Sequence, residues 1–174
     1  KILGSQCVLK ALKIPAVNSC PPAIFDIIIN NAAVRLDGTS HHYAPAEYPA
    51  VANYKIVAAL EAAAAEAGCP YHIGITASSD TFWPGQERYD SFTAYVPRHF
   101  QGSLKEWQAL GVMNYEMECA TLFTLASVFG LEAGSVCGVV AKRTQSEAVA
   151  PSDTYDRAFS FMIATVRGAV AKLY

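Results

Sequence analysis

Short apolar runs alternate with helical segments along most of this chain, and that alternation restricts the possible folds more than any other feature. The runs that predict buried strands are 27–29 (three isoleucines), 72–77, 112–117 and 135–141. The segments that predict helices are 51–67, 104–110, 118–129 and 154–173, and a glycine follows each of the first three. The pattern predicts an α/β fold: a mixed β-sheet with much parallel pairing and helices on its faces.

The composition agrees with a single domain over residues 1–174. Hydrophobic residues make up 52% of the 174 residues, which excludes a disordered chain and allows a sizeable core. The charged fraction of 16% is below the roughly one quarter that is usual in soluble domains. Much apolar surface therefore remains to be covered, which favours a subunit of an oligomer.

The charge balance and the lack of targeting patterns argue against a nucleic-acid-binding, membrane-spanning or secreted protein. Thirteen lysines and arginines against fifteen aspartates and glutamates leave no basic excess for binding nucleic acid. The alanine-rich stretch 56–68 contains two glutamates and is shorter than the ~20 apolar residues of a membrane span. The first residues do not have the pattern of a signal peptide. We therefore expect a cytoplasmic protein that binds neither nucleic acid nor membrane.

Neither the cysteines nor the histidines have the spacing of a metal site. The five cysteines are far apart with no CxxC pair, and the four histidines form no HxxxH or HExxH pattern. We expect reduced cysteines and no bound metal. The glycine-rich signatures of dinucleotide and P-loop sites and the GxSxG of serine hydrolases do not occur either.

Three polar segments each follow a predicted strand. They are 78–88 (SSDTFWPGQER), 116–119 (EMEC) and 142–147 (KRTQSE). Binding sites of parallel sheets lie at the carboxyl ends of the strands. We therefore expect the three segments to come together in one site.

The first segment combines aromatic and planar polar side chains. Gln86 and Arg88 are two residues apart in what we predict to be an extended segment, so both can point the same way. An amide offers a donor and an acceptor and a guanidinium offers a planar fork of donors, which together suit a pyrimidine edge. From the spacing alone, a surface ion pair of Arg88 with Glu87 or Asp90 is an open alternative.

The other two segments leave more than one interpretation open. Glu116 and Glu118 could accept from the hydroxyls of a ribose or act as a pair of glycosidase carboxylates, or Glu118 could stabilise the start of the following helix. Arg143 could close over an anion or hold a lid, or belong with Lys142 to a solvated surface pair.

Four stretches carry a family resemblance: VRLDG (34–38), GITASSDTFWPGQERYD (74–90), GVMNYEMECATL (111–122) and GVVAKRTQSE (138–147). Together they resemble bacterial uridine phosphorylases, a branch of the nucleoside phosphorylase family. The resemblance is close and collinear from about residue 26 to residue 147 and looser from there to the C-terminus. It implies an α/β nucleoside phosphorylase fold.

The implied activity is a pentosyl transfer, the reversible phosphorolysis of uridine to uracil and ribose 1-phosphate, in pyrimidine salvage and nucleoside catabolism. The resemblance implies that Gln86 and Arg88 read the uracil carbonyls and N3–H, and that Phe82 packs on the base. Tyr115 and Val140 would line the base pocket. Arg88 and Gln86 would then be catalytic, because they donate to the negative charge that grows on the leaving uracil.

On the sugar side, the resemblance implies that Met117 and Glu118 hold the ribose, with Glu118 catalytic through its contacts to the hydroxyls. Glu116 would lie in the same sugar pocket, and Arg143 would help to hold a closing segment in place. Inorganic phosphate would be the co-substrate, with no metal or organic cofactor. The resemblance also implies hexamers built from dimers, with neighbouring subunits completing the sites.

The N-terminal part departs from the family. The family binds phosphate with an N-terminal glycine-rich loop and a Gly-Thr-Thr-Gly turn, whereas here LGSQCVLKALKIPAVN (3–18) stands near the place of the turn. Phe25 replaces a family glycine, and Ala148-Val149 replaces a family proline. We expect either a truncated phosphorylase or a shortened relative. The alternatives to phosphorolysis are a nucleoside-binding protein without turnover and a nucleoside hydrolase of the same fold.

Overall fold

The computed structural model describes residues 2–3, 7–11, 22–143 and 152–174 of the chain. The expectations for 144–147 and 148–149, and for most of 3–18, therefore lie outside the described residues. The strands are β1 (Ile2–Leu3), β2 (Cys7–Ala11), β3 (Ile27–Leu36), β4 (Ala50–Val51), β5 (Tyr71–Ser79), β6 (Asn114–Glu116) and β7 (Ala133–Lys142). The α-helices are α1 (Tyr54–Glu66), α2 (Ser103–Ala109), α3 (Cys119–Val128) and α4 (Ser152–Leu173).

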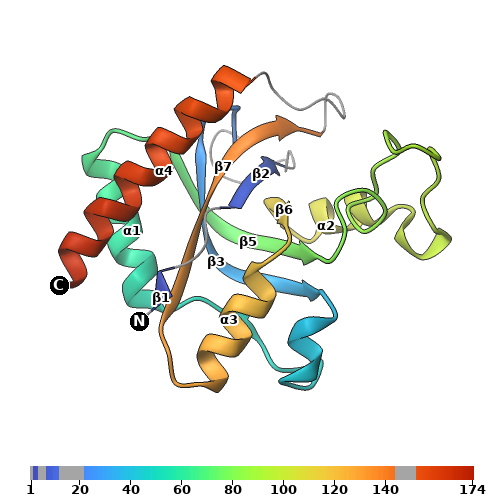
Figure 1. Cartoon of the computed structure of the whole chain (residues 1–174), viewed down its shortest axis with the longest axis horizontal. Coiled ribbons are helices and arrows are strands. Elements are labelled where there is room, and N and C mark those ends of the chain that lie inside the picture. The colour runs from blue at the N-terminus through green and yellow to red at the C-terminus, as the bar shows by residue number, and fades with distance from the viewer. Residues whose placement is uncertain (1, 4–6, 12–21, 144–151) are drawn as a thin grey trace.

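The strands form one mixed sheet in the order β1-β7-β2-β6-β5-β3-β4, and β7 pairs in addition with β3. The strands β7, β2, β6, β5 and β3 therefore close into a ring, with helices around it (Figure 1). The predicted α/β class with a mixed sheet is confirmed. The prediction of much parallel pairing is confirmed for β3 with β5, β5 with β6, and β7 with β1 and β2. The pairings of β7 with β3 and of β2 with β6 are antiparallel and make the sheet mixed.

Two predicted boundaries are wrong, each for a local reason. The strand predicted at 27–29 is the start of β3, which continues to Leu36 because residues beyond Asn30 still pair with β5. The helix predicted from Val51 begins at Tyr54, because Val51 pairs with Ala32 of β3. Asn53 caps this helix by accepting a hydrogen bond from the Lys55 backbone N–H at 2.9 Å.

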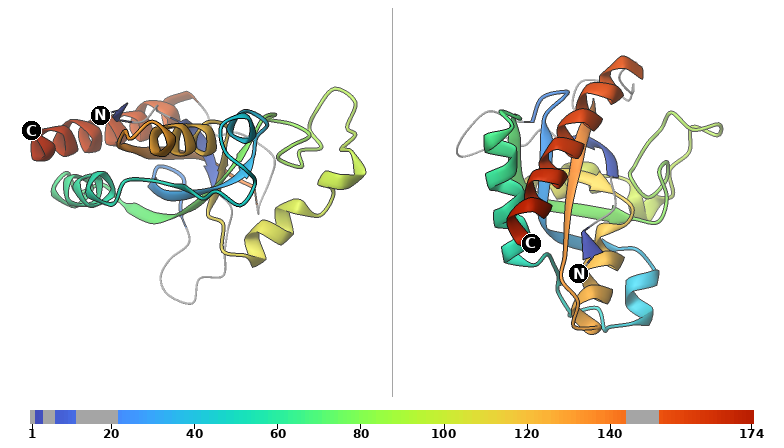
Figure 2. Two further views of the ribbon diagram at one scale, coloured as in Figure 1. Left: turned by 90° about the horizontal axis from the view of Figure 1, so that it is seen from below. Right: turned by 60° about the vertical axis from the view of Figure 1, so that its left-hand side comes forward.

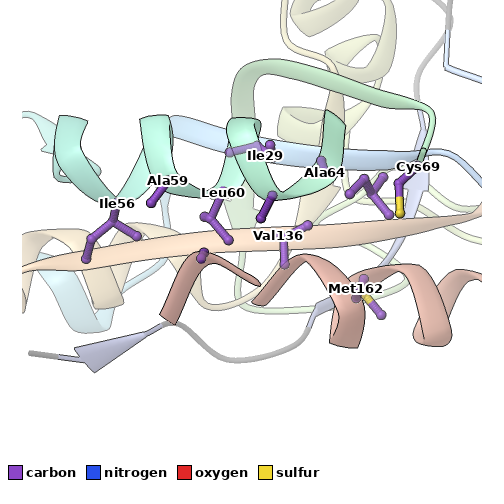
Figure 3. Close-up of a cluster of buried hydrophobic side chains, with 11 residues drawn as sticks. Ile29, Ile56, Ala59, Leu60, Ala64, Cys69, Val136 and Met162 are labelled. Carbon is purple, nitrogen blue, oxygen red and sulfur yellow. The ribbon is translucent and has the colours of Figure 1, made fainter. Parts of the chain in front are cut away.

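The main core lies where α1 and α4 pack on the sheet. Ile29 of β3 and Val136 of β7 contact Leu60 of α1 and Met162 of α4 in one buried cluster (Figure 3). Helix α1 approaches its neighbours closely, because most of its buried side chains are alanines. Its Ala63 lies against Gly168 of α4, and the two helices run side by side (Figure 2).

The remaining elements surround the candidate site. Helix α3 packs against β3 and β4, and the segment between β5 and α2 projects from the sheet away from α1 and α4 (Figures 1 and 2). Within the described part of the chain, no helix combines the length and the apolar character that crossing a bilayer requires.

Candidate functional site

Residues from the ends of β5, β6 and β7 meet on one side of the sheet. Strands β5 and β6 are parallel neighbours, so the segments that follow them emerge together. The end of β7 arrives by another route: Lys142 pairs with Ala11 of β2, and Ala11 pairs with Asn114 of β6. Ring closure through β2 thus brings Arg143, which follows β7, to the segment after β5.

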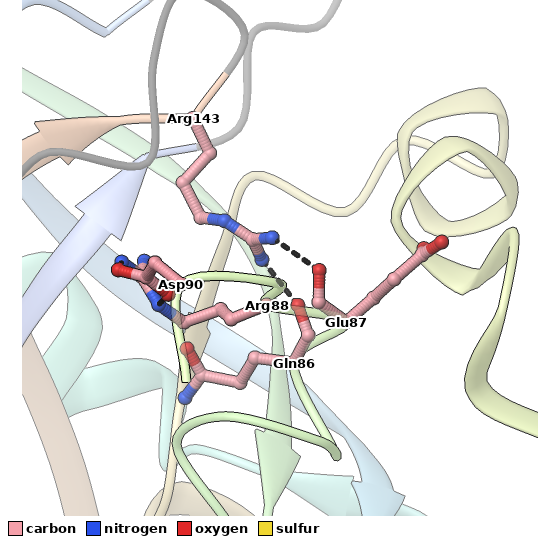
Figure 4. Close-up of polar contacts among 5 residues, drawn as sticks. All are labelled: Gln86, Glu87, Arg88, Asp90 and Arg143. Carbon is pink, nitrogen blue, oxygen red and sulfur yellow. Dashed lines mark hydrogen bonds and ion pairs between the residues drawn. The ribbon is translucent and has the colours of Figure 1, made fainter. Parts of the chain in front are cut away.

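Gln86 and Arg88 lie almost fully buried in this segment, with 1% and 0% of their surface exposed. The predicted extended backbone is wrong, because residues 84–87 form a turn and Glu87 has a left-handed φ of 52°. Both side chains nevertheless leave the turn on the same side (Figure 4). The Gln86 amide nitrogen and oxygen have no hydrogen-bond partner in the structure.

Arg88 has two neighbours that fix its guanidinium. Its Nε donates to Oδ1 of Asp90 at 2.9 Å, and its Nη2 donates to Oδ2 of the same carboxylate. The guanidinium carbon also lies 4.7 Å from the centre of the half-buried Phe82 ring, a cation–π contact. The ion pair with Asp90 that the spacing left open exists, but the guanidinium is inside the protein, where a bidentate pair orients it rigidly.

Arg143 holds the same turn from the other side. Its Nη1 donates to the Gln86 carbonyl, and its Nη2 donates to the Glu87 carbonyl at 2.7 Å (Figure 4). Arg143 is buried, so the alternative of a solvated surface pair is wrong. The arginine orients the backbone between Gln86 and Arg88.

Glu116 ends β6 below the first turn of α3. Its Oε2 accepts from the backbone N–H of Glu118 at 2.7 Å and of Cys119 at 2.5 Å, and its Oε1 accepts from Ser78 Oγ. Burial raises the pKa of the Glu116 carboxyl above its ordinary value, and these hydrogen bonds oppose that rise. In this structure it is Glu116 that stabilises the start of α3, the role that the sequence left open for Glu118.

Met117 and Glu118 lie at the exposed rim of a cavity of about 460 Å³. The rest of its lining is mostly apolar and comes from α3 and the residues after it: Thr121, Leu122, Leu125, Ala126, Phe129 and Leu131. Glu118 precedes α3 directly. The cavity therefore combines one carboxylate with a broad apolar wall.

Tyr115 of β6 and Val140 of β7 are buried in the sheet. Tyr115 packs with Ala77 and Val112, and its hydroxyl lies 3.5 Å from Ser103 Oγ. Burial raises the pKa of the Tyr115 phenol, although the Ser103 contact and the charge of Arg143 lower it. The roles of Tyr115 and Val140 beside a base stay predictions.

The structure adds two residues that sequence reasoning did not assign to the site. Glu87 accepts from the backbone N–H groups of Gly102 and Leu104, each at 2.6 Å. Asp37, which the sequence analysis named only within the stretch 34–38, accepts from Thr121 Oγ1 at 2.6 Å and so links the end of β3 to α3. The partners lie 15 or more positions away in the sequence, so no local signal could have found them.

Cys69, Cys119 and Cys137 are buried free thiols. Across the described ranges, no group of three or more histidine, cysteine, aspartate or glutamate side chains is placed to hold a metal ion.

Comparisons with known proteins agree with the resemblance. The family model described as the phosphorylase superfamily matches residues 18–171. Uridine phosphorylases from Escherichia coli (strain K12) and Haemophilus influenzae are 57% and 58% identical over 122 residues, 70% of this chain and 48% of each relative. A uridine phosphorylase from Thermococcus kodakarensis is 48% identical over 124 residues, 71% of this chain and 44% of the relative. The chain thus spans about half the length of the curated relatives it matches.

Proposed function

The chain belongs to the phosphorylase superfamily, and we propose that it acts within that superfamily as a uridine phosphorylase. The proposed reaction moves the ribosyl group of uridine to inorganic phosphate and releases uracil. The bond between the ribose C1′ and the base N1 breaks, and its electron pair leaves with the uracil. A phosphate oxygen bonds to C1′ to give ribose 1-phosphate, and the uracil anion takes up a proton from water.

The buried amide of Gln86 is the observation that supports this substrate most strongly. An amide that is buried with no partner on nitrogen or oxygen costs about 1–3 kcal/mol for each group left unsatisfied. A uracil edge offers one carbonyl acceptor beside the N3–H donor, so it would satisfy both atoms at once. Arg88, held by Asp90 and Phe82 on the same side of the turn, would donate to a uracil carbonyl.

The negative charge of the leaving uracil would give Arg88 a role in catalysis. Negative charge grows on the uracil as the bond breaks, and a fixed buried cation beside it stabilises the transition state more than the ground state. Met117 and Glu118 would hold the ribose, with Glu118 accepting from its hydroxyls, and Phe82 would pack on the base. Phosphate is the co-substrate in this proposal, and no metal or organic cofactor takes part.

Uracil release with and without phosphate tests the proposed reaction. We expect the chain to release uracil from uridine only when phosphate is present. Release without phosphate would indicate a hydrolase instead, and uridine binding without release would indicate a binding protein.

Variants then test the base pocket. Arg88→Ala should lower kcat about a hundredfold, the loss expected for one transition-state donor, with a smaller change in the Kd for uridine. Arg88→Lys should recover only part of the loss, because an ammonium cannot replace a planar fork. The exposed Arg98→Ala is the matched control and should keep normal turnover. Near-normal turnover in Arg88→Ala would refute this assignment.

The proposed enzyme is a homo-oligomer, a hexamer built from dimers. The cavity beside Met117 and Glu118 continues into exposed apolar side chains, including Phe129 at 57% and Leu131 at 41% exposure. A second copy of the chain would cover this surface and reach the sugar side of the site. Light scattering after size exclusion should show an oligomer that Phe129→Asp weakens and that Leu110→Asp, exposed outside this surface, leaves intact.

A cytoplasmic location also belongs to the proposal. The buried free thiols of Cys69, Cys119 and Cys137 suit a reducing compartment. Cell fractionation of the natural host, with the protein recovered in the cytoplasmic fraction, is the expected result. Recovery in an extracytoplasmic fraction would contradict it.

A further inference from the structure

Glu87 occupies an unusual backbone position between the two side chains proposed to read uracil. Its φ of 52° is left-handed, a conformation that residues with a Cβ adopt at a cost and that persists only where the surroundings hold it. Figure 4 shows its side chain leaving the turn on the side opposite to the Gln86 amide and Arg88. The left-handed backbone of Glu87 thus lets the side chains of Gln86 and Arg88 point to the same side of the turn.

The carboxylate of Glu87 is anchored to a distant part of the chain. Its Oε1 accepts from the Gly102 backbone N–H and its Oε2 from the Leu104 backbone N–H, each at 2.6 Å. The Tyr89 hydroxyl also donates to Oε1 at 3.3 Å. These donors lie at the start of α2 and beside the turn, so the side chain ties the turn to α2.

The backbone of Glu87 is held as well. Its carbonyl accepts from Nη2 of the buried Arg143 at 2.7 Å, and its N–H donates to the Pro84 carbonyl at 3.0 Å. Arg88 N–H closes the turn by donating to the Trp83 carbonyl at 2.8 Å. Side chain and main chain therefore fix the same residue from opposite sides.

The position of the carboxylate also has an electrostatic consequence. Glu87 is buried next to Arg88 in sequence, yet its charge is directed to the backbone donors of α2, while Arg88 pairs with Asp90. The Arg88 guanidinium therefore keeps the orientation that Asp90 gives it and is not turned toward the carboxylate of Glu87.

We propose that Glu87 is a positioning residue that locks the left-handed turn and thereby aims Gln86 and Arg88 at the same edge of the base. This inference rests on the proposed uridine phosphorylase function. Without the anchor, the backbone at residue 87 relaxes to an ordinary right-handed or extended conformation, which rotates Arg88 away from Gln86.

A glycine at position 87 separates the effect of the side-chain anchor from that of the left-handed backbone, because glycine adopts a left-handed φ without strain. Glu87→Ala removes the anchor and disfavours the turn, whereas Glu87→Gly removes the anchor but still permits the turn. We expect Glu87→Ala to lower kcat at least tenfold with a smaller change in KM, and Glu87→Gly to recover a clear part of that loss. Glu106→Ala, an exposed glutamate of α2, is the matched control and should keep the wild-type kcat.

Hydrogen exchange of the free protein provides a readout that needs no activity. Amides of 85–89 should exchange faster in Glu87→Ala than in wild type and in Glu106→Ala, while amides of β5 stay protected. The proposal is overturned if exchange in 85–89 is unchanged, or if the alanine and glycine variants have equal kcat. If the wild type releases no uracil, the proposed function fails. The exchange data then still decide whether Glu87 fixes the turn.

Discussion

The contact between α1 and α4 allows a stability prediction with a defined magnitude. A Cβ built on Gly168 would lie 2.9 Å from the Cβ of Ala63, closer than two carbon atoms can approach. The Ala63 methyl group is bonded directly to the backbone and is 2% exposed, so it can leave this contact only if the helix itself moves. The two helices can therefore hold one methyl group at this point but not two.

The expected free energies follow from three opposing effects. Gly168→Ala gains about 1 kcal/mol of helix propensity but strains the contact by about 2 kcal/mol, for a net loss near 1 kcal/mol. Ala63→Gly loses about 1 kcal/mol of propensity and roughly 0.8 kcal/mol of methyl burial. The double variant moves the methyl group from α1 to α4, so these effects cancel. Its stability should return to within about 0.5 kcal/mol of wild type, whereas additivity would give a loss near 3 kcal/mol.

Urea unfolding followed by circular dichroism measures these differences, at one fixed protein concentration because association also adds to stability. Ala62→Gly, an exposed neighbour on α1, is the control. It should cost only the helix propensity of about 1 kcal/mol and add to Gly168→Ala without coupling. If the Ala63→Gly and Gly168→Ala losses also add in the double variant, α4 does not dock on α1 as described.

Three further predictions concern the site and its surroundings. Gln86→Ala should relax the choice of base, which a comparison of kcat/KM for uridine and cytidine measures, because the amide supplies both a donor and an acceptor; unchanged selectivity would contradict it. Burial alone would raise the pKa of Asp37, but hydrogen bonds from Thr121 and Ser40 outweigh it and lower the pKa. Asp37 therefore adds stability above its unfolded pKa and loses it as pH falls through the lowered value. Thr121→Val should accordingly cost more stability at pH 7 than at pH 3 in urea unfolding, and an equal cost would refute the coupling. Arg35→Met removes donors to carbonyls of residues 44–48, so amides of 38–49 should exchange faster; unchanged exchange would show that other contacts hold this loop.

Much of the candidate site could be predicted because its signals are local. The apolar run at 72–77 predicted β5, and the polar segment 78–88 indicated where that strand ends. The spacing of Gln86 and Arg88 correctly placed both side chains on one side, although the backbone that achieves this is a left-handed turn. Helix ends marked by glycine were right within a few residues, because a glycine favours the left-handed cap that ends a helix.

Partners that are distant in sequence could not be predicted in this way. The sequence by itself determined where most strands and helices lie and which polar segments follow the strands, since hydrophobic periodicity is a pattern over a few neighbouring residues. Only the tertiary structure decided that β2 closes the ring and brings Arg143 to the carbonyls of Gln86 and Glu87. It also decided that Glu87 anchors to α2 instead of pairing with Arg88. The physical reason is that a buried charge takes whichever donors the packed fold places beside it, and that choice is absent from any local pattern.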